Sequence, residues 1–141
     1  MGDYLEKERP GMLQYLYMEW KKFFSAKRLY FSFKYAFNGL RVVFLEEQSF
    51  RIQLVLAVGL SGYMFAANWH IYTKGLVVLA CGLVLGLELI NSQIERTLNL
   101  LHPQQHPQVK KIKDIAAAAV LVAAAAAALL FALLIKDKGF H

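Results

Sequence analysis

Cysteine, proline and charged residues are all scarce in this 141-residue chain, and each scarcity narrows the possibilities. The single cysteine, Cys81, excludes an intramolecular disulfide and is typical of a small apolar side chain inside a hydrophobic run. With only three prolines, most of the chain is free to be helical. The sequence also lacks a Walker-type glycine loop, so an ordinary P-loop nucleotide site is excluded.

Apolar residues take the place of the missing charge. They make up 57% of the chain, and the mean hydropathy is +0.38, well above that of an ordinary soluble domain. A single domain of this length cannot hide so much apolar surface in a soluble core, so the composition favours a small protein that crosses a membrane several times. Net charge is +6, and nine of the sixteen basic residues precede Ile52. There they flank apolar segments, which favours the cytoplasmic leaflet of a membrane as their partner.

Three apolar runs predict an all-α membrane protein with three transmembrane helices, at about residues 52–69, 75–95 and 115–135. Residues 19–48 precede these spans and interleave aromatic with basic side chains, which predicts an amphipathic helix lying in the membrane interface. The same interleaving occurs in proteins that bind single-stranded nucleic acid by stacking. The spans that follow directly make that alternative remote.

These elements define one membrane domain, residues 19–135. Residues 1–18 form a leader of unassigned role, without the apolar core and cleavage site of a signal peptide, and residues 136–141 form a short polar tail. The third span is rich in alanine, a surface suited to close helix packing and to oligomerisation. Lys and Arg number nine before the first span, one in the first turn, four in the second loop and two in the tail. The positive-inside rule therefore predicts a cytoplasmic N-terminus and a cytoplasmic second loop.

The second span ends in a polar face. On a helix, Glu88, Asn91, Ser92 and Glu95 fall at i, i+3, i+4 and i+7, so all four line one side. With a rise of about 1.5 Å per residue, Glu88 lies roughly 10 Å deeper in the membrane than Glu95. An ionisable side chain at such depth is costly without a purpose, so this face is a candidate functional site.

The predicted topology brings further polar residues to the same cytoplasmic rim. Glu47 precedes the first span and Glu95 follows the second, and two such carboxylates can hold Mg²⁺ together with phosphate oxygens. Lys113 and Arg28 can neutralise phosphate charge. Glu88 can accept a proton from a hydroxyl group presented at the depth of the lipid headgroups. Phosphoryl transfer needs this combination of metal, cation and positioned base.

Several of these residues also have a purely structural interpretation. Glu47 can belong to a solvated helix end. Glu95 can form an interfacial ion pair with Arg96 or Lys113. Asn91 can join neighbouring helices by hydrogen bonds, as polar residues in spans often do.

The loop between the second and third spans contains two histidines that superficially suggest a zinc pair. His102 and His106 are each followed by a proline, and no cysteine or third ligand lies nearby. A turn-rich loop is therefore the better interpretation.

At these residues the sequence resembles the small bacterial integral-membrane lipid kinases, the prokaryotic diacylglycerol kinase and undecaprenol kinase family. The matching segments, in order, are FKYAFNGL at 33–40, EQSFR at 47–51, ELINSQIE at 88–95, and Lys113-Asp114 with the small-residue run that follows. The resemblance covers residues 28–135, with spacing like that of the family.

The resemblance implies a homotrimer in the bacterial inner membrane that uses Mg²⁺ and ATP to phosphorylate a lipid hydroxyl at the cytoplasmic face. Each subunit would have three spans and an N-terminal surface helix. Glu88 would be the general base, and Glu47 and Glu95 the metal ligands. The residues implied to bind the nucleotide or to support its site are Arg28, Tyr35, Glu47, Asn91, Glu95, Gln104, Gln105, His106, Lys113 and Asp114.

The chain departs from the family pattern in places. Asn99 stands where an Asp is usual, and Gln93 replaces a small residue, but the core acids are intact, so we expect activity. Residues 33–40, 50–53 and the His106-Pro107 loop look more like the undecaprenol branch, so undecaprenol is the favoured substrate and diacylglycerol the alternative. A catalytically degenerate lipid-binding scaffold is the alternative of another class. Proton or cation conduction is disfavoured because the acids cluster at one rim.

Overall fold

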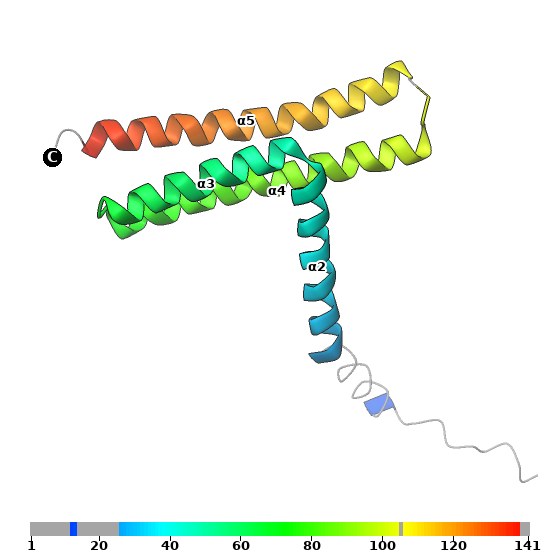
Figure 1. The fold of residues 1–141 in the computed structure, drawn as a ribbon, viewed down its shortest axis with the longest axis horizontal. Helices are drawn as coiled ribbons and strands as arrows, with labels where there is room; N and C mark the ends of the chain where they lie inside the picture. The colour runs from blue at the N-terminus through cyan, green and yellow to red at the C-terminus, as the bar shows by residue number, and fades with distance from the viewer. Residues whose placement is uncertain (1–11, 14–25, 105, 139–141) are drawn as a thin grey trace, which may run out of the picture. The chain divides into compact units, whose positions relative to one another are not determined.

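The computed structural model describes residues 12–13, 26–104 and 106–138. Within them the chain forms long α-helices only, as expected (Figure 1). The helices are α2 (Ala26–Glu46), α3 (Gln48–Ala66), α4 (Ile71–Leu101) and α5 (Pro107–Lys138). The chain divides into two units, Met1–Arg41 and Val42–His141, so α2 begins in the first unit and ends in the second.

Helices α3, α4 and α5 are each long and apolar enough to cross a membrane, which confirms the three expected spans. The helix bounds differ from the predicted spans: α3 begins at Gln48 and ends at Ala66, three residues before the predicted end of the first span, whereas α4 and α5 begin before their apolar runs. α4 begins at Ile71 although its apolar run begins at Gly75, and α5 begins at Pro107, eight residues before its apolar run. α2 ends at Glu46, and the part of the predicted interfacial helix before Ala26 lies outside the described residues. The interfacial position of this helix stays a prediction.

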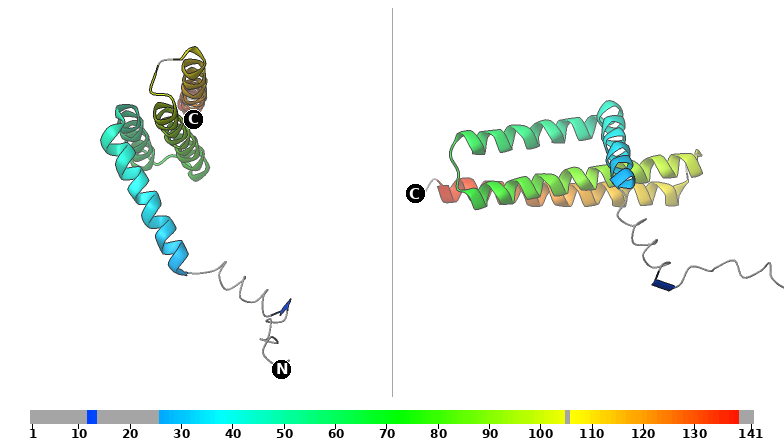
Figure 2. Two further views of the ribbon diagram at one scale, coloured as in Figure 1. Left: turned by 90° about the vertical axis from the view of Figure 1, so that its right-hand side faces the viewer. Right: turned by 90° about the horizontal axis from the view of Figure 1, so that it is seen from below.

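Helix α4 packs along both α3 and α5 (Figure 2). Most large apolar side chains on these three helices are nevertheless exposed, and on α5 only Val120 is buried. A soluble protein would not present so much apolar surface to water, whereas hydrocarbon chains solvate it well. The chain is therefore a multi-pass membrane protein.

The small apolar core lies at the turn between α3 and α4. Met64, Trp69 and Val77 are buried together, and the ring of Trp69 stacks on Phe131 of α5 with centroids 6.2 Å apart. Asn68 makes the turn possible by adopting a positive φ of 53°, a conformation that asparagine tolerates better than most residues. This cluster fastens all three spans at one end and leaves polar residues to organise the other.

A sharp break separates α2 from α3 at that other end. Glu47 has extended backbone angles (φ −102°, ψ 112°) between the last residue of α2 and the first of α3. Arg51 stabilises the break, since its Nη1 donates to the carbonyl oxygens of Phe44 and Leu45 at 3.0 and 2.9 Å. The last carbonyls of a helix lack partners within it, so the guanidinium supplies donors that they need.

Candidate active site

Glu88 lies inside the membrane-spanning bundle, on the side of α4 that faces α3. Only 5% of its surface is exposed, and Ser92, one turn along, is also buried. Gln53 of α3 donates a hydrogen bond from Nε2 to Oε2 of Glu88 at 3.2 Å. A buried carboxylate needs a hydrogen-bond donor, and here the donor is a neutral amide, since no cation within the described residues pairs with Glu88.

Asn91 and Glu95 continue the same face of α4 toward its C-terminal end. The Nδ2 of Asn91 donates to Oε1 of Glu95 at 3.3 Å, and both side chains are partly buried. The polar face expected from helical spacing is therefore present, with Asn91 holding Glu95 rather than joining neighbouring helices. Within the described residues Glu95 forms no ion pair with Arg96 or Lys113, so that structural interpretation is wrong.

Arg96 instead reaches across to the break between α2 and α3. Its Nη1 lies 2.8 Å from Oε2 of Glu46, and its Nη2 lies 2.8 Å from Oε1 of Glu47. The side chains of Arg96 and Glu47 are 32% and 31% exposed, and that of Glu46 is 58% exposed. Two charge-assisted hydrogen bonds from one planar guanidinium fix where the Glu47 carboxylate lies relative to α4.

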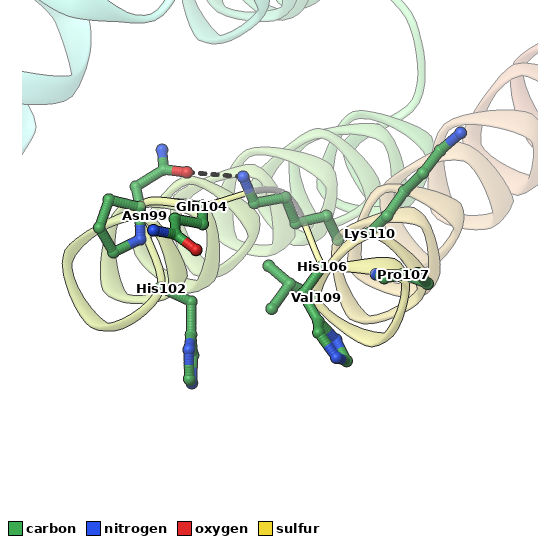
Figure 3. A pocket seen from close by; sticks show the side chains of 9 residues that line it. Asn99, His102, Gln104, His106, Pro107, Val109 and Lys110 are labelled. Atoms are coloured by element: carbon green, nitrogen blue, oxygen red, sulfur yellow. Dashed lines mark hydrogen bonds between the residues drawn. The ribbon is translucent and has the colours of Figure 1, made fainter.

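The loop between α4 and α5 and the helix ends beside it form a cavity of about 750 Å³. Figure 3 shows Asn99 and Gln104 on one side of it, and His106, Val109 and Lys110 on the other. The Nζ of Lys113 donates to Oδ1 of Asn99 at 2.6 Å. Because Asn99 is neutral, this contact holds the ammonium group in place without cancelling its charge.

His102 and His106 lie on the connection between α4 and α5. The Nδ1 of His106 accepts a hydrogen bond from the backbone N–H of Gln108 at 3.2 Å. No group of three His, Cys, Asp or Glu side chains gathers around a common point in the described part of the chain. The expected turn-rich loop is thus present between Leu101 and Pro107.

Some predicted nucleotide-binding residues stay predictions. Arg28 and Tyr35 are exposed on the part of α2 that belongs to the first unit, and Gln105 lies outside the described residues. Asp114 is exposed next to Lys113 on the first turns of α5.

Two residues that the sequence did not single out take part in this site, Gln53 and Arg96. Gln53 is the second residue of the predicted first span, and Arg96 directly follows Glu95. For Gln53, the signal is a polar side chain within a predicted span, because such residues often form hydrogen bonds with polar residues of neighbouring spans. For the second, adjacent residues of a helix point apart, so Arg96 needed a partner other than Glu95.

Comparison with known proteins identifies the family. The sequence model of the family described as prokaryotic diacylglycerol kinase matches residues 34–135. The chain belongs to this family. It is 37% identical over 96 residues to a diacylglycerol kinase of Helicobacter pylori, covering 64% of this chain and 71% of the relative. It is 31% identical over 91 residues to a diacylglycerol kinase of Pseudomonas aeruginosa, covering 64% and 74%.

An undecaprenol kinase of Bacillus subtilis is also similar, with 30% identity over 90 residues that cover 64% of this chain and 73% of the relative. Membership of this family, together with the three membrane-spanning helices, makes the protein a membrane lipid kinase with ATP as its phosphoryl donor.

Proposed function

We propose that the protein phosphorylates diacylglycerol, and that undecaprenol is the second candidate substrate. The observation that carries this preference is the higher identity to relatives named diacylglycerol kinase, 37% and 31% against 30% for the relative named undecaprenol kinase. The segment Phe50–Gln53 and the His106-Pro107 loop favour undecaprenol instead, the substrate that the sequence motifs predict. Both lipids present one hydroxyl at the headgroup level, so the same chemistry serves either.

In the proposed reaction Glu88 is the general base. Its carboxylate takes the proton of the lipid hydroxyl, the hydroxyl oxygen attacks the γ-phosphorus of ATP, and ADP leaves. The burial of Glu88 and the hydrogen bond to its Oε2 support this role, since they hold one oxygen and leave the other for the proton. Asn91 supports the site by holding Glu95.

The rim carboxylates of Glu47 and Glu95 are the proposed Mg²⁺ ligands. Oε1 of Glu47 accepts from Arg96 and Oε1 of Glu95 accepts from Asn91, whereas no hydrogen bond within the described residues reaches Oε2 of either carboxylate. Magnesium takes few carboxylates and completes its shell with phosphate oxygens and water, so two ligands from the chain suffice. When bound, the ion supplies positive charge to the transferring phosphoryl group.

The loop cavity is the proposed nucleotide site. It has basic and amide side chains in its walls, including Lys110, Lys113 and Gln104. An ammonium group held by a neutral amide is available to a phosphate oxygen. His106 also lines the cavity, and the further residues proposed to bind the nucleotide are Arg28, Tyr35, Gln105 and Asp114.

We further propose a homotrimer in the bacterial inner membrane, with the N-terminus in the cytoplasm. The alanine-rich α5 has one buried residue within the subunit, which leaves a small-residue surface for close helix packing with other subunits. The distribution of Lys and Arg supports the orientation.

A lipid-competition assay tests the proposed substrate. Purified protein in mixed micelles receives Mg-ATP with equal amounts of diacylglycerol and undecaprenol, and the two phosphorylated lipids are quantified. We expect phosphatidic acid to be the main product. A main product of undecaprenyl phosphate would overturn the preference, and no lipid phosphate of either kind would favour the degenerate lipid-binding scaffold.

A further inference from the structure

Gln53 forms a connection between two membrane-spanning helices at the buried carboxylate. The Nε2 of this side chain on α3 lies 3.2 Å from Oε2 of Glu88 on α4. Within the described residues it is the one side-chain hydrogen bond that joins the body of α3 (Gln48–Ala66) to α4. Farther along the pair, Leu60 and Met64 of α3 and Val77 of α4 belong to the apolar cluster at the turn.

Glu88 has no charged partner within the described part of the chain. The nearest cation on α3 is Arg51, whose guanidinium is engaged by the carbonyl oxygens at the end of α2. On α5 no titratable side chain occurs between Ile115 and Ile135. On α4 itself the next acidic side chain is Glu95, which Asn91 holds. A buried carboxylate needs a donor, and the amide of Gln53 supplies it.

The other end of the amide has no structural task. Oε1 of Gln53 is buried and has no hydrogen-bond partner in the described residues. A buried carbonyl oxygen without a partner costs about 1–3 kcal/mol, and leucine at this position would avoid that cost but leave Glu88 without its donor. The amide is oriented with its donor toward Glu88 because the opposite orientation would bring two acceptors together. The hydrogen bond to Glu88 is therefore the contact that accounts for a glutamine here.

We propose that Gln53 is a positioning residue for the phosphoryl-transfer reaction, holding Oε2 of Glu88 so that Oε1 is presented to the lipid hydroxyl. This inference rests on the proposed role of Glu88 as general base. Proton transfer needs the acceptor oxygen within hydrogen-bond reach of the hydroxyl, and a carboxylate free to rotate meets that geometry for only part of the time.

Two substitutions at residue 53 and one matched control test the proposal. Gln53→Leu removes the donor while keeping an apolar helix surface, and we expect kcat to fall about tenfold to a hundredfold with the KM values for lipid and ATP unchanged. Gln53→His keeps an N–H donor and is expected to restore most of kcat. Gln93→Leu makes the same chemical change at an exposed position of α4 and is expected to leave kcat unchanged.

Infrared difference spectroscopy provides a readout that does not depend on turnover. Subtracting the spectrum of Glu88→Gln from that of the parent protein isolates the carboxylate bands of Glu88. We expect these bands to shift in the Gln53→Leu background and to stay in place in the Gln93→Leu background, because only the first change removes a donor.

The outcomes separate the two claims. Unshifted bands in Gln53→Leu, or a kcat equal to that of the parent, would overturn the positioning role. A fall in kcat shared equally by Gln53→His would overturn it as well, because a donor would then be irrelevant. The proposed role of Glu88 as general base is tested separately, because near-normal turnover of Glu88→Gln would contradict it.

Discussion

One side-chain contact holds each of the carboxylates of Glu88 and Glu47, but the two lie in opposite surroundings. The contact of Glu88 joins α4 to α3, and that of Glu47 joins the residue before α3 to α4. Glu88 is 5% exposed and its partner is a neutral amide at 3.2 Å. Glu47 has a side chain that is 31% exposed, and its partner is a guanidinium at 2.8 Å. An ion pair deep in the bundle would have to overcome the desolvation of two charges, whereas water at the rim makes an ion pair inexpensive.

The difference explains how one helix pair can hold two carboxylates for two tasks. The amide at Glu88 holds one carboxylate oxygen by a hydrogen bond and brings no charge of its own. The guanidinium at Glu47 compensates part of the charge of two neighbouring acids and fixes their position. These surroundings support the two proposed roles, metal binding for Glu47 and proton transfer for Glu88.

The largest expected effect comes from neutralising the buried carboxylate. Glu88→Gln preserves the shape and hydrogen-bonding capacity of the side chain but removes the proton acceptor. We expect kcat to fall by about a thousandfold, within the range of general-base contributions. Turnover is measured with Mg-ATP and lipid in mixed micelles, and assembly is checked by size-exclusion chromatography. Near-normal turnover would contradict the assignment of Glu88 as general base, and with it the difference in role between Glu88 and Glu47.

Removing a rim carboxylate should act on metal affinity instead. Glu47→Gln is expected to raise the Mg²⁺ concentration for half-maximal activity by about tenfold or more. Binding of Mn²⁺, followed by electron paramagnetic resonance, measures the same loss without turnover.

Glu46→Gln is the matched control, because Glu46 pairs with the same arginine but is more exposed. We expect it to leave metal affinity near that of the parent protein. Equal losses in the two variants would mean that the ion pair with Arg96, and not the metal, is what both acids support.

The fold was largely predictable because its signal is local in the sequence. Long apolar runs need helices in a membrane, and this alone predicts three spans. The helix ends were less predictable, since hydropathy marks the buried part of a helix and not its full length. The polar turns Ile71–Lys74 and Pro107–Lys113 continue their helices outside the apolar runs.

The candidate site was predictable only where one helix carries it. The spacing of Glu88 and Glu95 places them on one face whatever surrounds the helix. The partners of these residues on other elements were not predictable. The contact of Gln53 depends on the rotation of α3 about its axis, and the contact of Arg96 depends on the break at Glu47. Neither is visible in the spacing of residues along one segment.

The smallest expected effect comes from removing the cation at the rim. Arg96→Gln breaks both contacts with Glu46 and Glu47, but these groups are partly hydrated, so we expect a loss of about 0.2–1 kcal/mol in the free energy of unfolding. Turnover should change by no more than about fivefold, the rate equivalent of that energy. Thermal unfolding in micelles and the kinase assay measure the two quantities, and Arg96→Lys should lose less of either. A loss of kcat as large as that of Glu88→Gln would instead place Arg96 in contact with the reacting groups, and the contrast between a buried chemical site and an electrostatic rim would no longer hold.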